Sequence, residues 1–164
     1  MSSLQDIERI LLVGIGATAV LDIWLILLRR MGVPTLNFAF VGRWVGHLTR
    51  GTMVHAGIAR STPIRGELAL GWFTHYAIGI SFAWALLVIQ GVSWARQPTL
   101  WPCILFGVCT VLMPLFVMQP AMGAGFASSK TAMPAKNVFR SVANHTVFGL
   151  GLYLSSLFAA PLLR

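Results

Sequence analysis

Four long apolar stretches constrain the fold of this chain more than any other feature of its sequence. They cover about residues 7–28, 68–92, 100–118 and 142–163. Each is long enough to cross the ~30 Å hydrocarbon core of a bilayer as a helix that rises ~1.5 Å per residue. Of the 164 residues, 57% are hydrophobic and only 10% are charged, which is unlike an ordinary soluble domain. The sequence therefore predicts an all-α polytopic membrane protein, with residues 1–164 forming a single membrane domain, a four-transmembrane-helix bundle.

The basic residues are distributed unequally between the two sides of the predicted membrane. Nine Lys or Arg residues fall in the segments about 29–67 and 119–140, whereas the other side has only Arg9, Arg96 and Arg164. Because Lys and Arg accumulate in cytoplasmic loops, both termini are expected on the non-cytoplasmic side. The membrane also accounts for the net charge of +8, so the expected partner of these charges is the lipid bilayer and not nucleic acid.

The segment 31–66 between the first two stretches contains apolar residues at helical spacing, with basic residues opposite them. The apolar positions are Phe40, Val41, Trp44, Val45 and Leu48. This pattern is typical of a short amphipathic helix that lies in the membrane interface, here on the cytoplasmic side. Gly42 and Gly46 form a GxxxG pair within it, which would let this helix pack closely against a membrane span.

Polar side chains inside the predicted spans are the main functional signal. Asp22, His75 and His145 come from three different spans, and each lies one to two helical turns inside the predicted cytoplasmic boundary. Such groups are costly in hydrocarbon, so we expect them to face the bundle interior or a wet cavity. Three further polar residues lie slightly nearer the same surface. With Glu67, Gln119 and Asn144 included, the sequence predicts one polar pocket of six residues that faces the cytoplasm.

Several chemistries fit this pocket. Asp22, His75 and His145 are a competent first shell for a transition metal such as zinc or iron. The same three groups could relay protons, or act as general acid and base on a lipid-like substrate. A structural alternative is that Asp22 bonds to one of the two histidines and locks the bundle, or pairs with Arg29 or Arg30. The sequence contains no HExxH or GxSxG motif that would indicate an enzyme, so whether the protein is an enzyme stays open.

Two basic residues are candidates for binding a lipid head group. Lys130 lies in the Gly- and Ser-rich segment 119–137, which does not match a P-loop, and Arg43 lies in the predicted amphipathic helix. The alternative for Lys130 is an ordinary exposed loop. His47 and His55 would join the polar pocket only if the segment 31–66 folds back over the bundle.

The interpretation favoured by these residues is a protein that binds or translocates a small solute or a cation, either a metal or a proton, through the Asp22/His75/His145 pocket. A bundle this small leaves little room for a transport pathway within one chain, so a homo-oligomer is expected if the protein transports anything. One alternative is a metal-dependent membrane enzyme that acts on a lipid-like substrate. Another is an accessory subunit whose interfacial helix docks a partner membrane subunit.

The segments 14–24, 37–47, 66–79 and 118–125 together resemble a family of small bacterial inner-membrane proteins that is defined only as a domain of unknown function. The resemblance extends over nearly the whole chain. It implies a bacterial inner-membrane location and a layout of about four spans. It implies no activity, so no catalytic residue can be transferred to this chain from the family.

Overall fold

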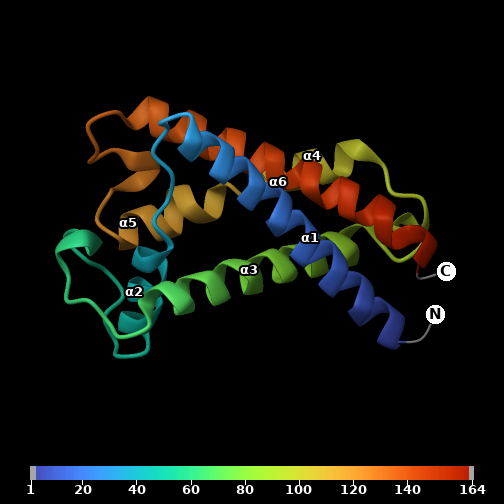
Figure 1. Cartoon of the computed structure of the whole chain (residues 1–164), viewed down its shortest axis with the longest axis horizontal. Helices are drawn as coiled ribbons and strands as arrows, with labels where there is room; N and C mark the ends of the chain where they lie inside the picture. Colours follow the sequence, from blue (N-terminus) through green and yellow to red (C-terminus); the bar gives the residue numbers. More distant parts are fainter. Residues whose placement is uncertain (1–2, 163–164) are drawn as a thin grey trace. The chain divides into compact units, whose positions relative to one another are not determined.

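A computed structural model of the chain describes residues 3–162. Leu163 and Arg164, which the sequence analysis assigned to the end of the fourth span and to the C-terminal charge, lie outside the described residues. The regular elements within the described range are all helical (Figure 1). They are α1 (Ser3–Arg30), α2 (Phe38–Leu48), α3 (Glu67–Gln90), α4 (Leu100–Cys109), α5 (Gln119–Ala121) and α6 (Pro134–Leu162), with short helical turns at Ile58–Arg60, Trp94–Arg96, Pro114–Met118 and Phe126–Ser128.

Four of the helical segments are long and apolar enough to cross a membrane, which confirms the all-α class and the four long apolar helices that the sequence predicts. They are Leu4–Arg30, Glu67–Gln90, Leu100–Ala121 and Pro134–Leu162. The fourth begins eight residues before the predicted boundary at residue 142. The apolar run begins at residue 142, but the helix begins at Pro134, because proline is favourable in the first turn of a helix. The first turns of the helix are therefore polar, and only the later turns are apolar.

The third span is irregular in its middle, as the proline inside it predicts. α4 ends at Cys109, and the segment Pro114–Met118 forms a π-helical turn before α5. Proline has no N–H to donate to the preceding turn, and its ring crowds the carbonyl four residues earlier. The helix therefore changes its hydrogen-bond pattern at Pro114.

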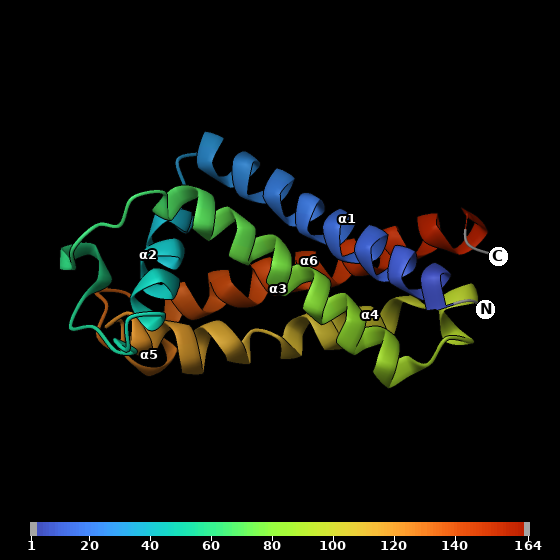
Figure 2. The same cartoon turned by 90° about the horizontal axis from the view of Figure 1, so that it is seen from below.

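The chain forms two compact units. Unit 1 comprises Met1–Pro34, Tyr76–Thr110 and Asn144–Arg164, and unit 2 comprises Thr35–His75 and Val111–Ala143. The helices α3 and α6 each contribute residues to both units. In unit 1, α1 begins and α6 ends at the same end of the unit (Figures 1 and 2).

The core of unit 1 is small and is built around close helix contacts. Its buried cluster consists of Val13, Ala17, Ala83, Leu86, Cys103, Phe148, Leu152 and Ala159. Glycines allow the backbones to approach: a Cβ atom on Gly107 would lie 2.5 Å from the Gly149 Cα, and one on Gly14 would lie 2.5 Å from the Ile80 Cα. Small residues at such contacts are typical of membrane helices, where packing replaces the hydrophobic effect.

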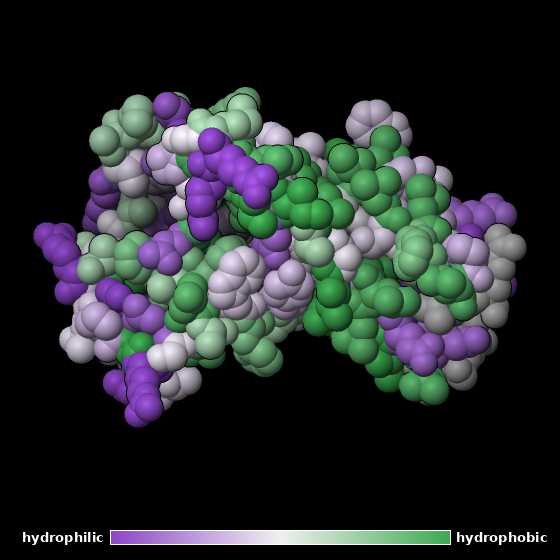
Figure 3. Space-filling model, in the orientation of Figure 1, coloured by the Kyte–Doolittle hydropathy of each residue, from purple (hydrophilic) through white to green (hydrophobic). Residues whose placement is uncertain are grey.

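Large apolar side chains cover the outside of the spans. Phe73, Val88 and Ile23 have exposed fractions of 73%, 62% and 59%. Figure 3 shows apolar surface over the helices of unit 1 on the face drawn, with hydrophilic residues gathered where α1 begins. An apolar exterior over long apolar helices is the arrangement that a lipid environment requires.

Candidate functional site

Two side-chain hydrogen bonds join α1 to the other helices of unit 1. The Tyr76 hydroxyl of α3 donates to Asp22 Oδ2 at 2.8 Å, and Trp24 Nε1 donates to Asn144 Oδ1 of α6 at 2.9 Å. Asp22 is buried, with 9% of its surface exposed. Sequence reasoning placed Asp22 and Asn144 at similar depths but missed Tyr76, because a tyrosine near a span end is typical of the membrane interface.

His145 makes a third bond of this kind, between α6 and the end of α4. Its Nδ1 lies 2.7 Å from Thr110 Oγ1, and the Thr110 hydroxyl donates to the Gly107 carbonyl at 2.6 Å. Because the hydroxyl proton is already used, the His145 Nδ1–H is the donor to Thr110. His145 therefore ties two helices together by a hydrogen bond.

The predicted metal site receives no support from these contacts. Asp22 and His145 have separate partners in unit 1, while His75 belongs to unit 2, where its ring centroid lies 4.4 Å from that of Phe38 and 5.9 Å from that of Trp72. Among residues 3–162, no group of three or more His, Cys, Asp or Glu side chains could hold a metal ion.

Glu67 forms an ion pair with Arg43, which the sequence analysis assigned to a lipid head group. Arg43 Nη2 lies 2.7 Å from Glu67 Oε1, and Arg43 Nε donates to Oε2 at 2.8 Å. Arg43 Nη1 also donates to the carbonyls of Ile58 and Ser61, at 3.1 and 3.0 Å. The hydrogen bonds to Glu67 raise the pKa of the Arg43 guanidinium. Arg43 is only 7% exposed and all its nitrogens are engaged, so its assignment to a lipid head group is not supported.

This ion pair depends on close packing between α2 and the first turns of α3. A Cβ atom on Gly42 would collide with the Glu67 carbonyl oxygen, and one on Gly71 would collide with the Phe38 carbonyl oxygen. Asn37 Oδ1 caps α2 by accepting the Ala39 N–H at 3.0 Å. The predicted short helix therefore forms, and its GxxxG face packs on a span as expected.

The two remaining predicted residues lie in or beside the loop after α5. Gln119 Oε1 accepts a hydrogen bond from the Ser128 hydroxyl at 2.9 Å. Lys130 has an exposed side chain, and its backbone N–H donates to Ala124 at 2.9 Å. The assignment of Lys130 to a lipid head group stays a prediction. Among the described residues, the side chain of Gln119, which begins α5, thus bonds a residue of the loop that follows α5 and none of the other five residues predicted to share a pocket with it.

Unit 2 contains an open polar groove that the sequence analysis did not predict as a site. Its volume is about 470 Å³, and it is lined by His47, Arg50, Thr52, His55, Ser61 and Thr62. The two histidines meet in it: His47 Nδ1 lies 2.8 Å from His55 Nε2, and their rings stack with centroids 5.0 Å apart. All six residues lie at the end of α2 or in the segment that connects α2 to α3.

Backbone hydrogen bonds hold this connecting segment in place. The His55 N–H donates to the Ala121 carbonyl at 2.8 Å, and the Ile58 N–H donates to the Met122 carbonyl at 2.9 Å. The next part of the segment is held by Arg43, which donates hydrogen bonds to the carbonyls of Ile58 and Ser61. His55 is consequently only 8% exposed, and its Nδ1 atom is buried with no hydrogen-bond partner in the described part of the chain.

The groove is positively charged. Arg50 carries a permanent charge, and none of the lining residues is acidic. Glu67 interacts electrostatically with His47, but its charge is matched by Arg43. The C-terminal dipole of α2 favours cations; its effect is reduced because the His47 carbonyl accepts the N–H groups of both Arg50 and Thr52 at 3.0 Å.

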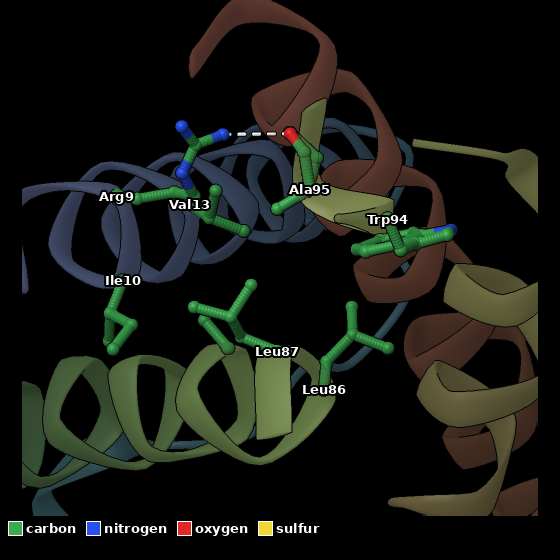
Figure 4. Close-up of a pocket in the computed structure, with 9 residues that line it drawn as sticks. Arg9, Ile10, Val13, Leu86, Leu87, Trp94 and Ala95 are labelled. Atoms are coloured by element: carbon green, nitrogen blue, oxygen red, sulfur yellow. Dashed lines mark hydrogen bonds between the residues drawn. The ribbon is translucent and has the colours of Figure 1, made fainter. Parts of the chain in front are cut away.

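A second, smaller cavity in unit 1 is too small for a solute. Figure 4 shows it between Arg9, Val13 and Leu86, with Arg9 Nη1 donating to the Ala95 carbonyl at 2.7 Å. Its volume of about 10 Å³ would hold roughly one water molecule. Its lining is mostly apolar, so the basic groove of unit 2 is the better candidate for a ligand.

These observations define an all-helical protein with four helices that can span a membrane and a basic groove outside them. A family scan matches residues 11–159 to the protein of unknown function DUF2938, and the chain belongs to that family. No curated protein and no solved structure is similar enough to the chain to match it. The family assignment agrees with the resemblance in the sequence and brings no activity with it.

Proposed function

We propose that this chain is a bacterial inner-membrane protein that binds a small anionic solute in the groove lined by His47, Arg50 and His55. Both termini lie on the non-cytoplasmic side in this proposal, and the groove faces the cytoplasm. The unequal distribution of basic residues supports that orientation. The observation that carries the function is the lining of the groove, which combines one guanidinium, two imidazoles and three hydroxyls with no carboxylate.

The donors in this lining suit an oxyanion. A guanidinium presents several N–H groups in a fixed fork that matches carboxylate and phosphate oxygens. The hydroxyls of Thr52 and Thr62 can each donate one further hydrogen bond, whereas the Ser61 hydroxyl already donates to the Gly57 carbonyl at 3.4 Å. A cation in the same place would meet the Arg50 charge and only two imidazole nitrogens that already bond each other. The expectation of a small solute is therefore kept, with an anion as the preferred class.

A thermal-shift screen tests this proposal directly. The protein would be purified in neutral lipid nanodiscs and heated with inorganic phosphate, succinate or zinc chloride. Because a ligand that binds only the folded state stabilises it, we expect an anion to raise the melting temperature and zinc to leave it unchanged. Arg50→Gln should remove the anion effect, while Arg65→Gln, which changes an exposed arginine outside the groove, should keep it. Stabilisation by zinc alone would refute the proposal.

Proton handling at Asp22 is a second candidate function. The observation that favours it is a buried carboxyl group inside a span, bonded to the Tyr76 hydroxyl. A bundle of four helices that moved protons would be expected to act as a homo-oligomer. Proton uptake into proteoliposomes, measured with a pH-sensitive dye, should then fall in Asp22→Asn. No uptake by the wild type would remove this candidate.

A further inference from the structure

We infer that His55 fixes the tautomer of His47 so that the groove offers a His47 Nε2–H donor to a phosphate group. This inference rests on the proposed anion site and deepens it, since it specifies the ligand chemistry and gives the two histidines different roles. His47 is the group that touches the ligand. His55 is a positioning residue that acts through His47.

The first step is the location of the proton on His55. Its Nδ1 atom is buried and has no hydrogen-bond partner in the described residues. An N–H group left unpaired in such a place loses its hydration without compensation, and buried N–H groups without a partner are rarer in proteins than buried acceptors without one. The neutral ring therefore carries its proton on Nε2, and this Nε2–H donates to His47 Nδ1 across the 2.8 Å contact.

The second step follows for His47. Because its Nδ1 accepts a hydrogen bond, a neutral His47 ring carries its own proton on Nε2. His47 lines the groove, and its Nε2 has no partner elsewhere in the part of the chain that the structure describes. The Nε2–H is then the one ring group of His47 that can bond a ligand. In a metal site, both His47 Nδ1 and His55 Nε2 would point a lone pair at one ion, whereas here the His55 Nε2 carries a proton and donates it to His47 Nδ1.

The third step is the number of donors. With His47 in this tautomer, the groove offers donors from four side chains, His47, Arg50, Thr52 and Thr62, because the Ser61 hydroxyl already donates to the Gly57 carbonyl. A carboxylate has two oxygens to accept them, whereas a terminal phosphate group has three or four in a tetrahedral arrangement. The groove thus matches a phosphate group, which free phosphate or a lipid head group could supply.

Two measurements test the inference. The first is ¹⁵N NMR of the wild type labelled at histidine, in neutral nanodiscs. We expect both His47 and His55 to give the shifts of the Nε2–H tautomer, and phosphate to move the His47 Nε2 signal. A signal for Nδ1–H on His55, or a response of His55 and not His47, would overturn the inference. This measurement needs no variant and does not depend on one folding.

The second measurement compares variants in binding titrations. His55→Leu removes the donor to His47 Nδ1 and should weaken phosphate binding about tenfold. His55→Gln has an amide that can replace Nε2–H and should bind within a few-fold of the wild type. Equal binding by the leucine variant would overturn the role of His55. Binding of succinate as tightly as phosphate would overturn the ligand class.

Inorganic phosphate and a short-chain phosphatidic acid serve as separate probes, so that the two sources of a phosphate group are distinguished. Binding of either probe that His55→Leu weakens supports the inference, and the tighter probe identifies the source. If the wild type binds no anion at all, the proposed function fails. If it binds anions through Arg50 but without dependence on His55, only the inference fails.

Discussion

The groove is expected to depend on the Arg43–Glu67 pair for its stability. Arg43→Met would remove two charge-assisted hydrogen bonds to Glu67 and the bonds to the Ile58 and Ser61 carbonyls. It would also leave the Glu67 carboxylate in a half-buried place without its counter-charge. Removing one partner of a buried pair costs about 3–5 kcal/mol, and an exposed pair contributes under about 1 kcal/mol. Because this pair lies between these limits, with side chains 8% and 17% exposed, we expect a loss of about 2–3 kcal/mol.

Two assays would measure this effect. The melting temperature of the purified protein should fall by roughly 5 °C or more in Arg43→Met. Hydrogen exchange of the backbone amides in residues 57–62 should become faster, because that segment loses the side chain that binds its carbonyls. Arg65→Met is the matched control, since it removes an exposed arginine from the same segment. If Arg43→Met behaves like this control in both assays, the ion pair does not hold the groove and the reasoning is refuted.

Three further predictions concern the spans. In a double-mutant cycle, Asp22→Ala and Tyr76→Phe should show a coupling energy of about 1 kcal/mol in thermal or chemical unfolding; additive effects would mean that the hydrogen bond contributes nothing. Gly107→Ala should destabilise the protein by about 1–3 kcal/mol, because its Cβ would press on the Gly149 backbone, whereas Leu105→Ile, at a side chain that is 62% exposed, should be nearly neutral; equal effects would contradict the close contact. In a background without Cys103 and Cys109, an impermeant thiol reagent added to intact cells should label Ser93→Cys and not Ser129→Cys; the reverse pattern would invert the proposed orientation.

The fold could be predicted from the sequence because one property determines it. Apolar length sets the number of spans, and a helix is the structure in which a single segment satisfies its own backbone in lipid. The helix ends could not be predicted so well, since α6 begins at Pro134, in polar sequence where hydropathy gives no signal. The proline in the third span did indicate its irregular middle, because the missing N–H has a direct structural effect.

The candidate site was much harder to predict. Asp22, Asn144 and His145 all belong to unit 1, but their depth along a helix cannot say which side chain each group faces. Tyr76 is adjacent to His75 in the chain, and a one-residue step on a helix turns the side chain by ~100°. The rotation of each helix about its own axis is set by its packing against the other helices, and a single sequence contains no direct signal for that packing.

The groove depends on contacts between residues that are far apart in the chain. His55 is held by the Ala121 carbonyl, 66 positions away, and Arg43 bonds Glu67 across 24 positions. The sequence did contain a signal for the Arg43–Glu67 pair. Gly42 precedes Arg43, and Gly71 lies one helical turn after Glu67. Glycines next to two opposite charges indicate that the two helices could approach closely at that point.

Calorimetric titration of inorganic phosphate into the wild-type protein in neutral nanodiscs tests the central claim most directly. The account predicts saturable binding near one phosphate per chain, which Arg50→Gln removes and Arg65→Gln retains. Saturable binding that survives Arg50→Gln would place the anion elsewhere. No binding by a well-folded wild type would contradict the assignment of this groove as an anion site.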